Sequence, residues 1–253
     1  MNYINIPETT PDGVRHFTFY SHLYHHDLGY AVYLPPDYET GGKTYPVHYH
    51  FHGWQGCEIS DISAMEAVYG NSDTIFVFPN ISDEMGEDRD LPVEQMFFQE
   101  LIPYMEKTYC ISPKNRTISG FSMGGGMAVW YALKHPGMFS DVIAYAGTFH
   151  HYYHKDYMTA FVPVERAEEL YRGMRQTVWE SDRNMLAWFN RTPVDAFRLR
   201  ICIGTEDPLY CDAEVLHRHL TAIGFRHTYR VIDGADHSLD NIVKGLNEHE
   251  SVW

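Results

Sequence analysis

The fold of this chain is predicted by one stretch, Arg116-Thr117-Ile118-Ser119-Gly120-Phe121-Ser122-Met123-Gly124-Gly125-Gly126. Its first four residues have the composition of a short β-strand, and the residues from Gly125 to Lys134 have helical composition and spacing. A G-x-S-x-G pentapeptide between a strand and a helix predicts a nucleophile elbow, a tight turn that exposes a serine hydroxyl. The glycines are needed because such a turn leaves no room for Cβ atoms. Ser122 is therefore the candidate nucleophile, and a plain glycine-rich turn is the alternative.

Strand-like and helix-like segments alternate along the 253 residues, which predicts an α/β fold with a mostly parallel central sheet flanked by helices. Apolar or alternating runs predict strands over residues 14–24, 30–34, 46–51, 74–78, 141–146, 199–203 and 227–232, the first two as an antiparallel pair. Helices are expected over 60–69, 92–109 and 213–223 and at the C-terminus. No repeat, linker or low-complexity tract divides the sequence, so we expect a single domain over residues 1–253.

Residues 148–190 interrupt the alternation with a small aromatic-rich insert. Within it, helices are expected over 164–174 and 182–190. Two interpretations are open: the insert forms a cap over Ser122, or it packs outside the sheet.

A serine hydroxyl needs a base to activate it, and the base needs a carboxylate to orient it. Asp207 follows the predicted strand 199–203, and His237 follows the predicted strand 227–232. The carboxyl ends of parallel strands meet at one edge of a sheet, so both side chains are expected near Ser122. Their order along the chain, serine, acid and histidine, fits this type of elbow. Glu206 is the rival acid, and turn or capping roles are the alternatives for Asp207 and His237.

The negative oxygen that forms when serine attacks an ester carbonyl must be met by preorganised N–H donors. One predicted donor is the backbone amide of Met123, directly after the nucleophile. The other is the amide of Trp54, in the glycine-containing loop His52-Gly53-Trp54-Gln55-Gly56 that follows the strand 46–51. A simple turn at His52-Gly53 is the alternative.

The formal net charge of −15 argues against binding to nucleic acid or to anionic membranes. The first seven residues have neither a basic start nor an apolar stretch, and no segment approaches a membrane span. A cytoplasmic location is therefore expected, with a trimmed secreted protein as the alternative. The cysteines have no metal-type spacing and are expected to be free thiols, or to form one disulfide: Cys57, Cys110, Cys202 and Cys211.

Sixteen histidines raise the possibility of a metal site. His48, His50 and His52 alternate along a predicted strand and so share one face, and His150, His151 and His154 cluster in a loop. The sequence contains no H-E-x-x-H motif, and no acidic residue stands at a ligand-like offset beside either group. We therefore expect structural or surface histidines and no metal.

Seven landmarks span most of the chain: V-Y-L-P-P-D-Y at 32–38, H-G at 52–53, E-L-I-P-Y-M-E-K-T-Y at 100–109, G-F-S-M-G-G at 120–125, A-L-K-H-P at 132–136, G-T-E-D at 204–207 and G-A-D-H at 234–237. In this order the chain resembles the esterase D family, which includes feruloyl, acetyl-xylan and siderophore trilactone esterases and S-formylglutathione hydrolases. The resemblance implies an α/β-hydrolase fold, Ser122, Asp207 and His237 as a catalytic triad, and no cofactor. The loop after His52-Gly53 only partly matches the formylglutathione branch, which disfavours it.

The expected function is that of a serine carboxylesterase that acts on a small-molecule ester, with acetyl or hydroxycinnamoyl esters of sugars as the first substrates to test. A siderophore-type trilactone esterase and an acyltransferase with the same triad are alternatives. A non-catalytic binding protein on a hydrolase scaffold is the alternative from another class. The sequence leaves the oligomeric state open.

Overall fold

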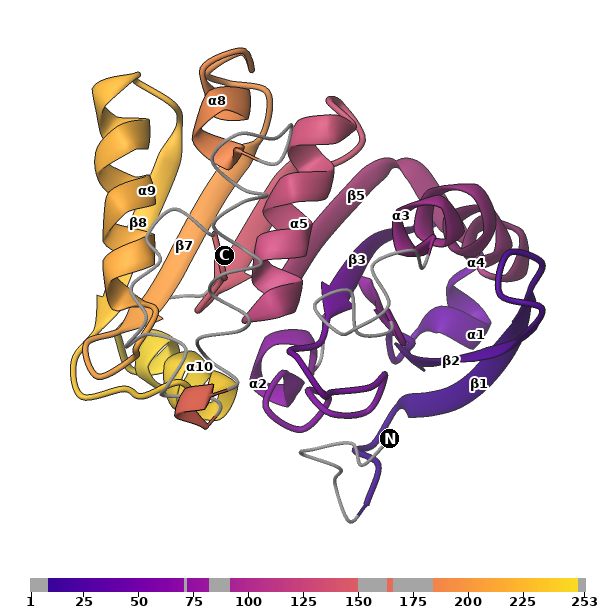
Figure 1. Ribbon diagram of the computed structural model, residues 1–253. Coiled ribbons are helices and arrows are strands. Elements are labelled where there is room, and N and C mark those ends of the chain that lie inside the picture. The colour runs from indigo at the N-terminus through magenta and orange to yellow at the C-terminus, as the bar shows by residue number, and fades with distance from the viewer. Residues whose placement is uncertain (1–8, 71, 82–91, 150–162, 166–183, 250–253) are drawn as a thin grey trace.

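Figure 1 shows the computed structural model, which describes residues 9–70, 72–81, 92–149, 163–165 and 184–249. Eight strands form one sheet: β1 (Val14–Ser21), β2 (His26–Tyr33), β3 (Tyr45–Phe51), β4 (Ile75–Pro79), β5 (Ile111–Phe121), β6 (Asp141–Tyr145), β7 (Arg198–Gly204) and β8 (His227–Ile232). Their order across the sheet is β1-β2-β4-β3-β5-β6-β7-β8. β1 and β2 pair antiparallel, β2 pairs antiparallel with β4, and the other neighbours are parallel. The predicted mostly parallel sheet with an antiparallel opening pair is confirmed.

The helices are α1 (Tyr38–Gly41), α2 (Glu66–Tyr69), α3 (Val93–Gln95), the π-helical η1 (Met96–Leu101), α4 (Ile102–Thr108), α5 (Met123–Lys134), α8 (Met185–Phe189), α9 (Tyr210–Ala222) and α10 (Leu239–His249). Helix α5 crosses one face of the sheet, with α8 and α9 beside it (Figure 1). Helices α2 and α10 pack against each other, and Tyr69 of α2 contacts Phe76 and Phe78 on the opposite face. The sheet is therefore covered on both faces, as expected for parallel strands.

Alternation along β5 divides its side chains between these two faces. Gly120 faces α5, because a Cβ atom there would lie 2.2 Å from the carbonyl carbon of Gly124. Ser119 points the other way and shares its face with His48 and His50 of β3. One face of the central strands is thus apolar and the other is partly polar.

Aromatic rings fill the layer between β3 and the helices. Phe97 is fully buried, and its ring centroid lies 4.8 Å from that of Phe51, 5.2 Å from that of Tyr49 and 5.9 Å from that of Tyr131. These residues come from η1, β3 and α5, so a single side chain joins three elements of the fold.

Two predicted helices differ from the structure. The helix expected over 92–109 is present, but its middle turn widens into η1 just before Pro103. Proline has no N–H and its ring crowds the carbonyl four residues earlier, and a π-turn relieves this conflict. The helix expected over 60–69 is wrong in its first half, because only Glu66–Tyr69 is helical. There Ser60 Oγ accepts from the Cys57 amide, a local bond that competes with helix formation.

The insert predicted over 148–190 lies largely outside the described residues, as does most of the helix expected over 164–174. Helix α8 falls within the predicted range 182–190 and packs on α5, with the rings of Trp188 and Trp130 5.5 Å apart. Whether the insert caps the site is not tested and stays a prediction.

None of the helices in the described part of the chain combines the length and the apolar composition that crossing a bilayer requires.

Replacing Phe97 by alanine should lower the free energy of unfolding by about 3–5 kcal/mol, because a large ring that joins three elements leaves a cavity. Denaturant unfolding followed by circular dichroism measures this loss. Val194→Ala is the control, since Val194 is 47% exposed and its truncation should stay within about 0.5 kcal/mol of wild type. Equal losses in the two variants would contradict the assignment of Phe97 to the core.

Candidate active site

Ser122 occupies the turn between β5 and α5 with a strained backbone, at φ 54° and ψ −116°. Three backbone hydrogen bonds hold it: its amide donates to the Tyr145 carbonyl over 2.9 Å, and its carbonyl accepts from the amides of Gly126 (3.1 Å) and Thr148 (3.0 Å). Such a conformation costs on the order of 1–3 kcal/mol and persists only where the surroundings impose it. The backbone of Ser122 therefore has the strained turn conformation predicted for a nucleophile elbow.

Close packing around the turn explains the glycine at position 124. A Cβ atom on Gly124 would lie 2.2 Å from the carbonyl oxygen of Phe51 and 2.6 Å from that of His52. The start of α5 thus rests directly on the end of β3. This contact brings the loop after β3 next to the serine.

The structure brings Ser122, His237 and Asp207 together at the carboxyl edge of the sheet. His237 Nε2 lies 3.0 Å from Ser122 Oγ, and His237 Nδ1 lies 2.8 Å from Asp207 Oδ2. A carboxylate can only accept, so the imidazole proton sits on Nδ1 and the Nε2 lone pair faces the hydroxyl. This is the arrangement that lets a histidine accept a serine proton.

Asp207 is held for this contact by its own turn. Its side chain is fully buried, and its second oxygen, Oδ1, accepts from the Leu209 amide over 2.8 Å. The rival carboxylate, Glu206, is exposed, and its amide donates to the Ala235 carbonyl. Adjacent residues of the turn point apart, and Asp207 is the one that meets the histidine.

The loop with the first predicted oxyanion donor lies beside the nucleophile. A Cβ atom on Gly53 would lie 3.5 Å from Ser122 Cβ. The Gly56 amide donates to the Gly53 carbonyl over 3.0 Å, and Gln55 has φ 60°, the geometry of a type II turn. Trp54 is the second residue of that turn, so the turn's own hydrogen bond does not use its amide.

His52 determines which way this amide points. Its Nε2 accepts from the Ile81 amide over 3.2 Å, so the ring proton is on Nδ1, which donates to the Gly53 carbonyl over 2.8 Å. In a trans peptide the C=O and the following N–H point in opposite directions. The Trp54 N–H therefore points away from the His52 ring.

The second predicted donor, the amide of Met123, belongs to the first residue of α5. Amides in the first turn of a helix have no acceptor within the helix, and the positive end of the helix dipole lies there. The Met123 amide directly follows Ser122, and the Trp54 amide belongs to the loop beside it; their role as oxyanion donors stays a prediction.

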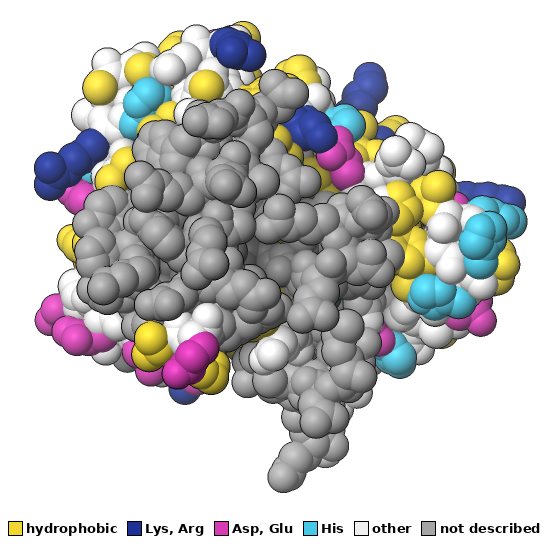
Figure 2. All heavy atoms as spheres, in the orientation of Figure 1, with side chains coloured by type: hydrophobic (Ala, Val, Ile, Leu, Met, Phe, Trp, Pro, Cys, Tyr) yellow, Lys and Arg dark blue, Asp and Glu magenta, His cyan; other side chains and the backbone are white. Residues whose placement is uncertain are grey.

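The histidines fall into two groups. Figure 2 shows histidines on the surface around β1 and β2, where His16, His22, His25 and His26 are exposed. His48 and His50 on β3, and His52 directly after it, are buried instead. Burial lowers the pKa of His48 well below its ordinary value and also lowers the pKa of His52. The described residues hold no group of three or more histidine, cysteine or acidic side chains that could bind a metal.

Sequence reasoning missed two polar partners of these histidines, Ser119 and Asp61. Ser119 Oγ lies 2.6 Å from His48 Nε2 and 2.7 Å from His50 Nδ1, and His50 Nε2 lies 3.1 Å from Asp61 Oδ2. A signal existed in the alternation of Thr117 and Ser119 on the strand that pairs with β3. The cluster of His150, His151 and His154 lies outside the described residues.

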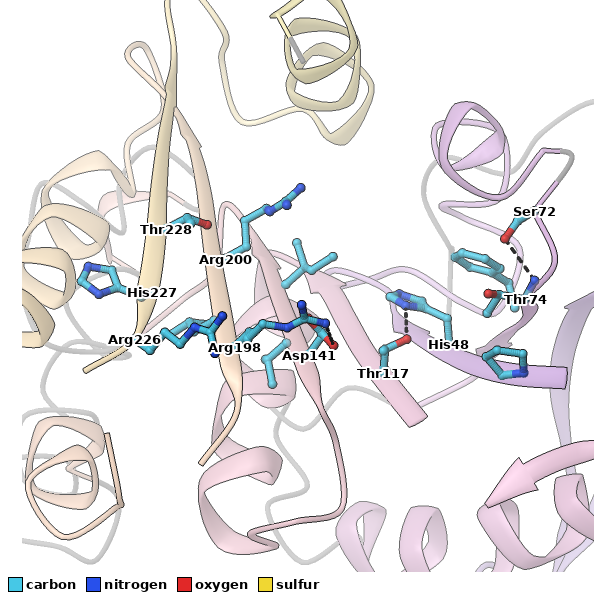
Figure 3. Close-up of a pocket in the computed structure, with 15 residues that line it drawn as sticks. His48, Ser72, Thr74, Thr117, Asp141, Arg198, Arg200, Arg226, His227 and Thr228 are labelled. Carbon is cyan, nitrogen blue, oxygen red and sulfur yellow. Dashed lines mark hydrogen bonds and ion pairs between the residues drawn. The ribbon is translucent and has the colours of Figure 1, made fainter. Parts of the chain in front are cut away.

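A cavity of about 580 Å³ lies at the opposite, amino edge of the sheet (Figure 3). It is lined by His48 and Thr117 and by three arginines, of which Arg198 forms an ion pair with Asp141. Its lining includes none of the predicted catalytic residues, which lie at the carboxyl edge of the sheet.

The four cysteines all lie in the described part of the chain and have free thiols. Cys57 and Cys202 are buried, and burial raises the pKa of the Cys202 thiol to about 12. A thiol held in its neutral form is a poor nucleophile, so Cys202 is inert.

Solved structures of an esterase and of a hydrolase have the same arrangement of elements as this chain. A ferulic acid esterase matches 96% of this chain and 97% of its own, with a TM-score of 0.73 and 23% identity. The S-formylglutathione hydrolase FrmB from Staphylococcus aureus matches 93% of this chain and 96% of its own, with a TM-score of 0.75 and 17% identity. The chain therefore has the predicted α/β-hydrolase fold.

The chain belongs to the Esterase family, described as "Putative esterase", whose family model matches residues 21–253. Two esterases of Mycobacterium tuberculosis, MT1326 from strain CDC 1551 / Oshkosh and Rv1288 from strain H37Rv, are each 32% identical over 135 residues. The match covers 47% of this chain and 29% of theirs, so the chain spans less than a third of the length of these relatives.

Asp207→Asn should lower kcat for ester hydrolysis by about 10²–10⁴-fold, because an amide can favour the wrong imidazole tautomer and cannot stabilise the imidazolium. Glu206→Gln is the matched control on the neighbouring residue and should cost less than about tenfold. Steady-state kinetics of both variants measures the difference. A crippled glutamate variant beside an active aspartate variant would transfer the acid role to Glu206.

Buried His48 should make the protein less stable in acid. Its folded pKa lies below its unfolded value, so the unfolded chain binds the extra proton, and stability falls as the pH drops below about 6.5. Denaturant unfolding between about pH 7 and pH 5 should show this slope, and His48→Gln should make it shallower. His26→Gln, at an exposed position, should keep the wild-type slope. An unchanged slope in His48→Gln would contradict the assignment.

Proposed function

We propose that this protein is a serine carboxylesterase that hydrolyses small carboxylic esters through an acyl-enzyme. The observation that carries the proposal is the hydrogen-bonded series Ser122–His237–Asp207 at a strained elbow. Membership of the Esterase family supports the same reaction.

In the acylation step, Ser122 Oγ attacks the ester carbonyl carbon while His237 Nε2 accepts the hydroxyl proton. The carbonyl oxygen becomes an oxyanion, which the amides of Trp54 and Met123 stabilise. Each such donor contributes on the order of 10²–10³ in rate. The tetrahedral intermediate collapses, the bond to the leaving alcohol breaks, and the imidazolium protonates that alcohol. Asp207 stabilises the imidazolium throughout.

In the deacylation step, water takes the place of the alcohol. His237 accepts a proton from the water as it attacks the acyl carbon, a second oxyanion forms in the same place, and Ser122 leaves with the proton returned by the imidazolium. Side chains and backbone amides fill every role, so this mechanism assigns no step to a cofactor or metal.

The substrate class we propose is a soluble acetyl or hydroxycinnamoyl ester of a sugar. The fold shared with a ferulic acid esterase is compatible with this class, and the family landmarks in the sequence point the same way. A trilactone esterase, or an acyltransferase in which an alcohol replaces water, would use the same residues. Product analysis with added alcohol separates hydrolysis from transfer, and a panel of acyl esters identifies the acyl group.

Ser122→Ala should reduce p-nitrophenyl acetate hydrolysis to near background, because covalent catalysis is lost and only the contribution of binding and the oxyanion donors remains. The wild type should also be labelled by a fluorophosphonate probe, and the variant should not. Circular dichroism of both proteins checks that the fold is unchanged.

Two outcomes would contradict the proposal. Retention of more than about a tenth of the wild-type kcat in Ser122→Ala would place the nucleophile elsewhere. A wild-type protein that is neither labelled nor active on any ester of the panel would favour the non-catalytic binding scaffold.

A further inference from the structure

His50 lies on a central strand of the sheet, and its ring contacts both β5, which leads to Ser122, and the loop that contains Trp54. It is 1% exposed and is the cross-strand partner of Ser119, which stands three residues before the nucleophile. The mechanism proposed above does not use His50. Its position nevertheless connects the two halves of the site.

Both nitrogens of the His50 ring have partners. Nε2 lies 3.1 Å from Asp61 Oδ2, and Nδ1 lies 2.7 Å from Ser119 Oγ. A carboxylate only accepts, so Nε2 donates to Asp61 and Nδ1 accepts the Ser119 hydroxyl proton. Ser119 Oγ then accepts from His48 Nε2, at 2.6 Å. The series His48–Ser119–His50–Asp61 is therefore satisfied with one proton on each imidazole ring and the hydroxyl proton of Ser119.

Two consecutive hydrogen-bonded turns restrict the segment from Gly53 to Asp61, here called the oxyanion loop. Its first turn is closed by the Gly56 amide on the Gly53 carbonyl, and its second by the Ser60 amide on the Cys57 carbonyl over 3.0 Å. The Ser60 hydroxyl also accepts from the Cys57 amide over 2.9 Å. Because the turns follow one another directly, a shift of Asp61 is passed on to Trp54.

Asp61 is the buried anchor at the end of the oxyanion loop, with 4% of its surface exposed. A buried carboxylate is costly unless it is paired and hydrogen-bonded. Its bond to His50 therefore selects one position of the loop among those that sterics would allow. On the other side of the same ring, Ser119 ties His50 to β5.

We infer that His50 and Asp61 are positioning residues. The bond between the His50 ring and the Asp61 carboxylate ties the oxyanion loop to β3, the strand that pairs with β5, and so sets the distance between the Trp54 amide and Ser122. This inference rests on the proposed function. Neither residue touches the reacting atoms, so the effect is expected on transition-state stabilisation and not on substrate binding.

His48 provides a matched control. It lies on the same face of the same strand with the same 1% exposure, and its ring bonds to the β5 hydroxyls of Thr117 and Ser119. Figure 3 shows its bond to Thr117 at the wall of the amino-edge cavity. The hydrogen bonds of its ring run to β5 and not to the oxyanion loop.

The test uses two amides at position 50. The nitrogen of glutamine reaches the place of Nε2, so His50→Gln keeps a donor for Asp61. Asparagine is shorter and reaches only the place of Nδ1, so His50→Asn keeps the contact to Ser119 and leaves Asp61 without its donor. The variants differ by one methylene group and carry the same charge.

His50→Asn should lower kcat for p-nitrophenyl acetate by about 10–100-fold with KM within about threefold of wild type, since small misplacements of a catalytic group have effects of this size. His50→Gln, and both His48→Gln and His48→Asn, should stay within about threefold of the wild-type kcat. A trifluoromethyl ketone, which forms a tetrahedral oxyanion adduct with serine, adds a second readout. Its Ki should rise in His50→Asn by the factor that kcat/KM falls.

A second pair of variants applies if His50→Asn does not fold by circular dichroism. Asp61→Asn keeps an acceptor for His50 Nε2, so its kcat should stay within about threefold of wild type. Asp61→Leu removes the acceptor, so its kcat should fall by about 10–100-fold, as in His50→Asn. Equal kcat values within a pair would overturn the inference. So would an unchanged Ki, or a loss in His48→Asn as large as in His50→Asn. A wild type without esterase activity would instead remove the proposed function.

Discussion

The backbone of Ser122 is the constraint on which the rest of the site depends. Its left-handed conformation is unfavourable for a residue with a Cβ atom, and the bonds to the Tyr145 carbonyl and from the amides of Gly126 and Thr148 impose it. The same turn requires glycine at 120 and 124, because β3, β5 and α5 meet there without space for side chains. Strain at one residue thus determines how three elements pack.

The sheet makes the site by bringing together residues that are far apart in sequence. Asp207 and His237 stand at the ends of β7 and β8, and Ser122 at the end of β5. Parallel strands place these ends at one edge, where the His237 ring contacts both Ser122 and Asp207. On the face of the sheet covered by α5, the ring of Phe97 packs against Phe51 of β3 and Tyr131 of α5 and so holds these elements together.

The face of the sheet opposite α5 is partly polar where most parallel sheets are apolar. His48, His50 and Ser119 are buried there, and each has hydrogen-bond partners. A polar group buried in this way stabilises only the arrangement that satisfies it, since leaving it unpaired is costly. The polar face therefore adds specificity of position to a core that apolar contacts hold together.

The α/β class, the antiparallel opening pair, the elbow and the order of Ser122, Asp207 and His237 could all be predicted from the sequence, because these follow from local periodicity, glycine placement and chain order. The sequence could not choose between Asp207 and Glu206 by distance, nor foresee the widened turn before Pro103 or the loss of helix over residues 60–65. It also missed Ser119 and Asp61 as partners of His50. The two differences in the helices come from local effects, the ring of Pro103 and the bond from the Cys57 amide to Ser60, which hydrophobic periodicity does not reveal. The contacts of Asp207 with His237, and of Ser119 and Asp61 with His50, exist only once the tertiary structure brings distant segments together.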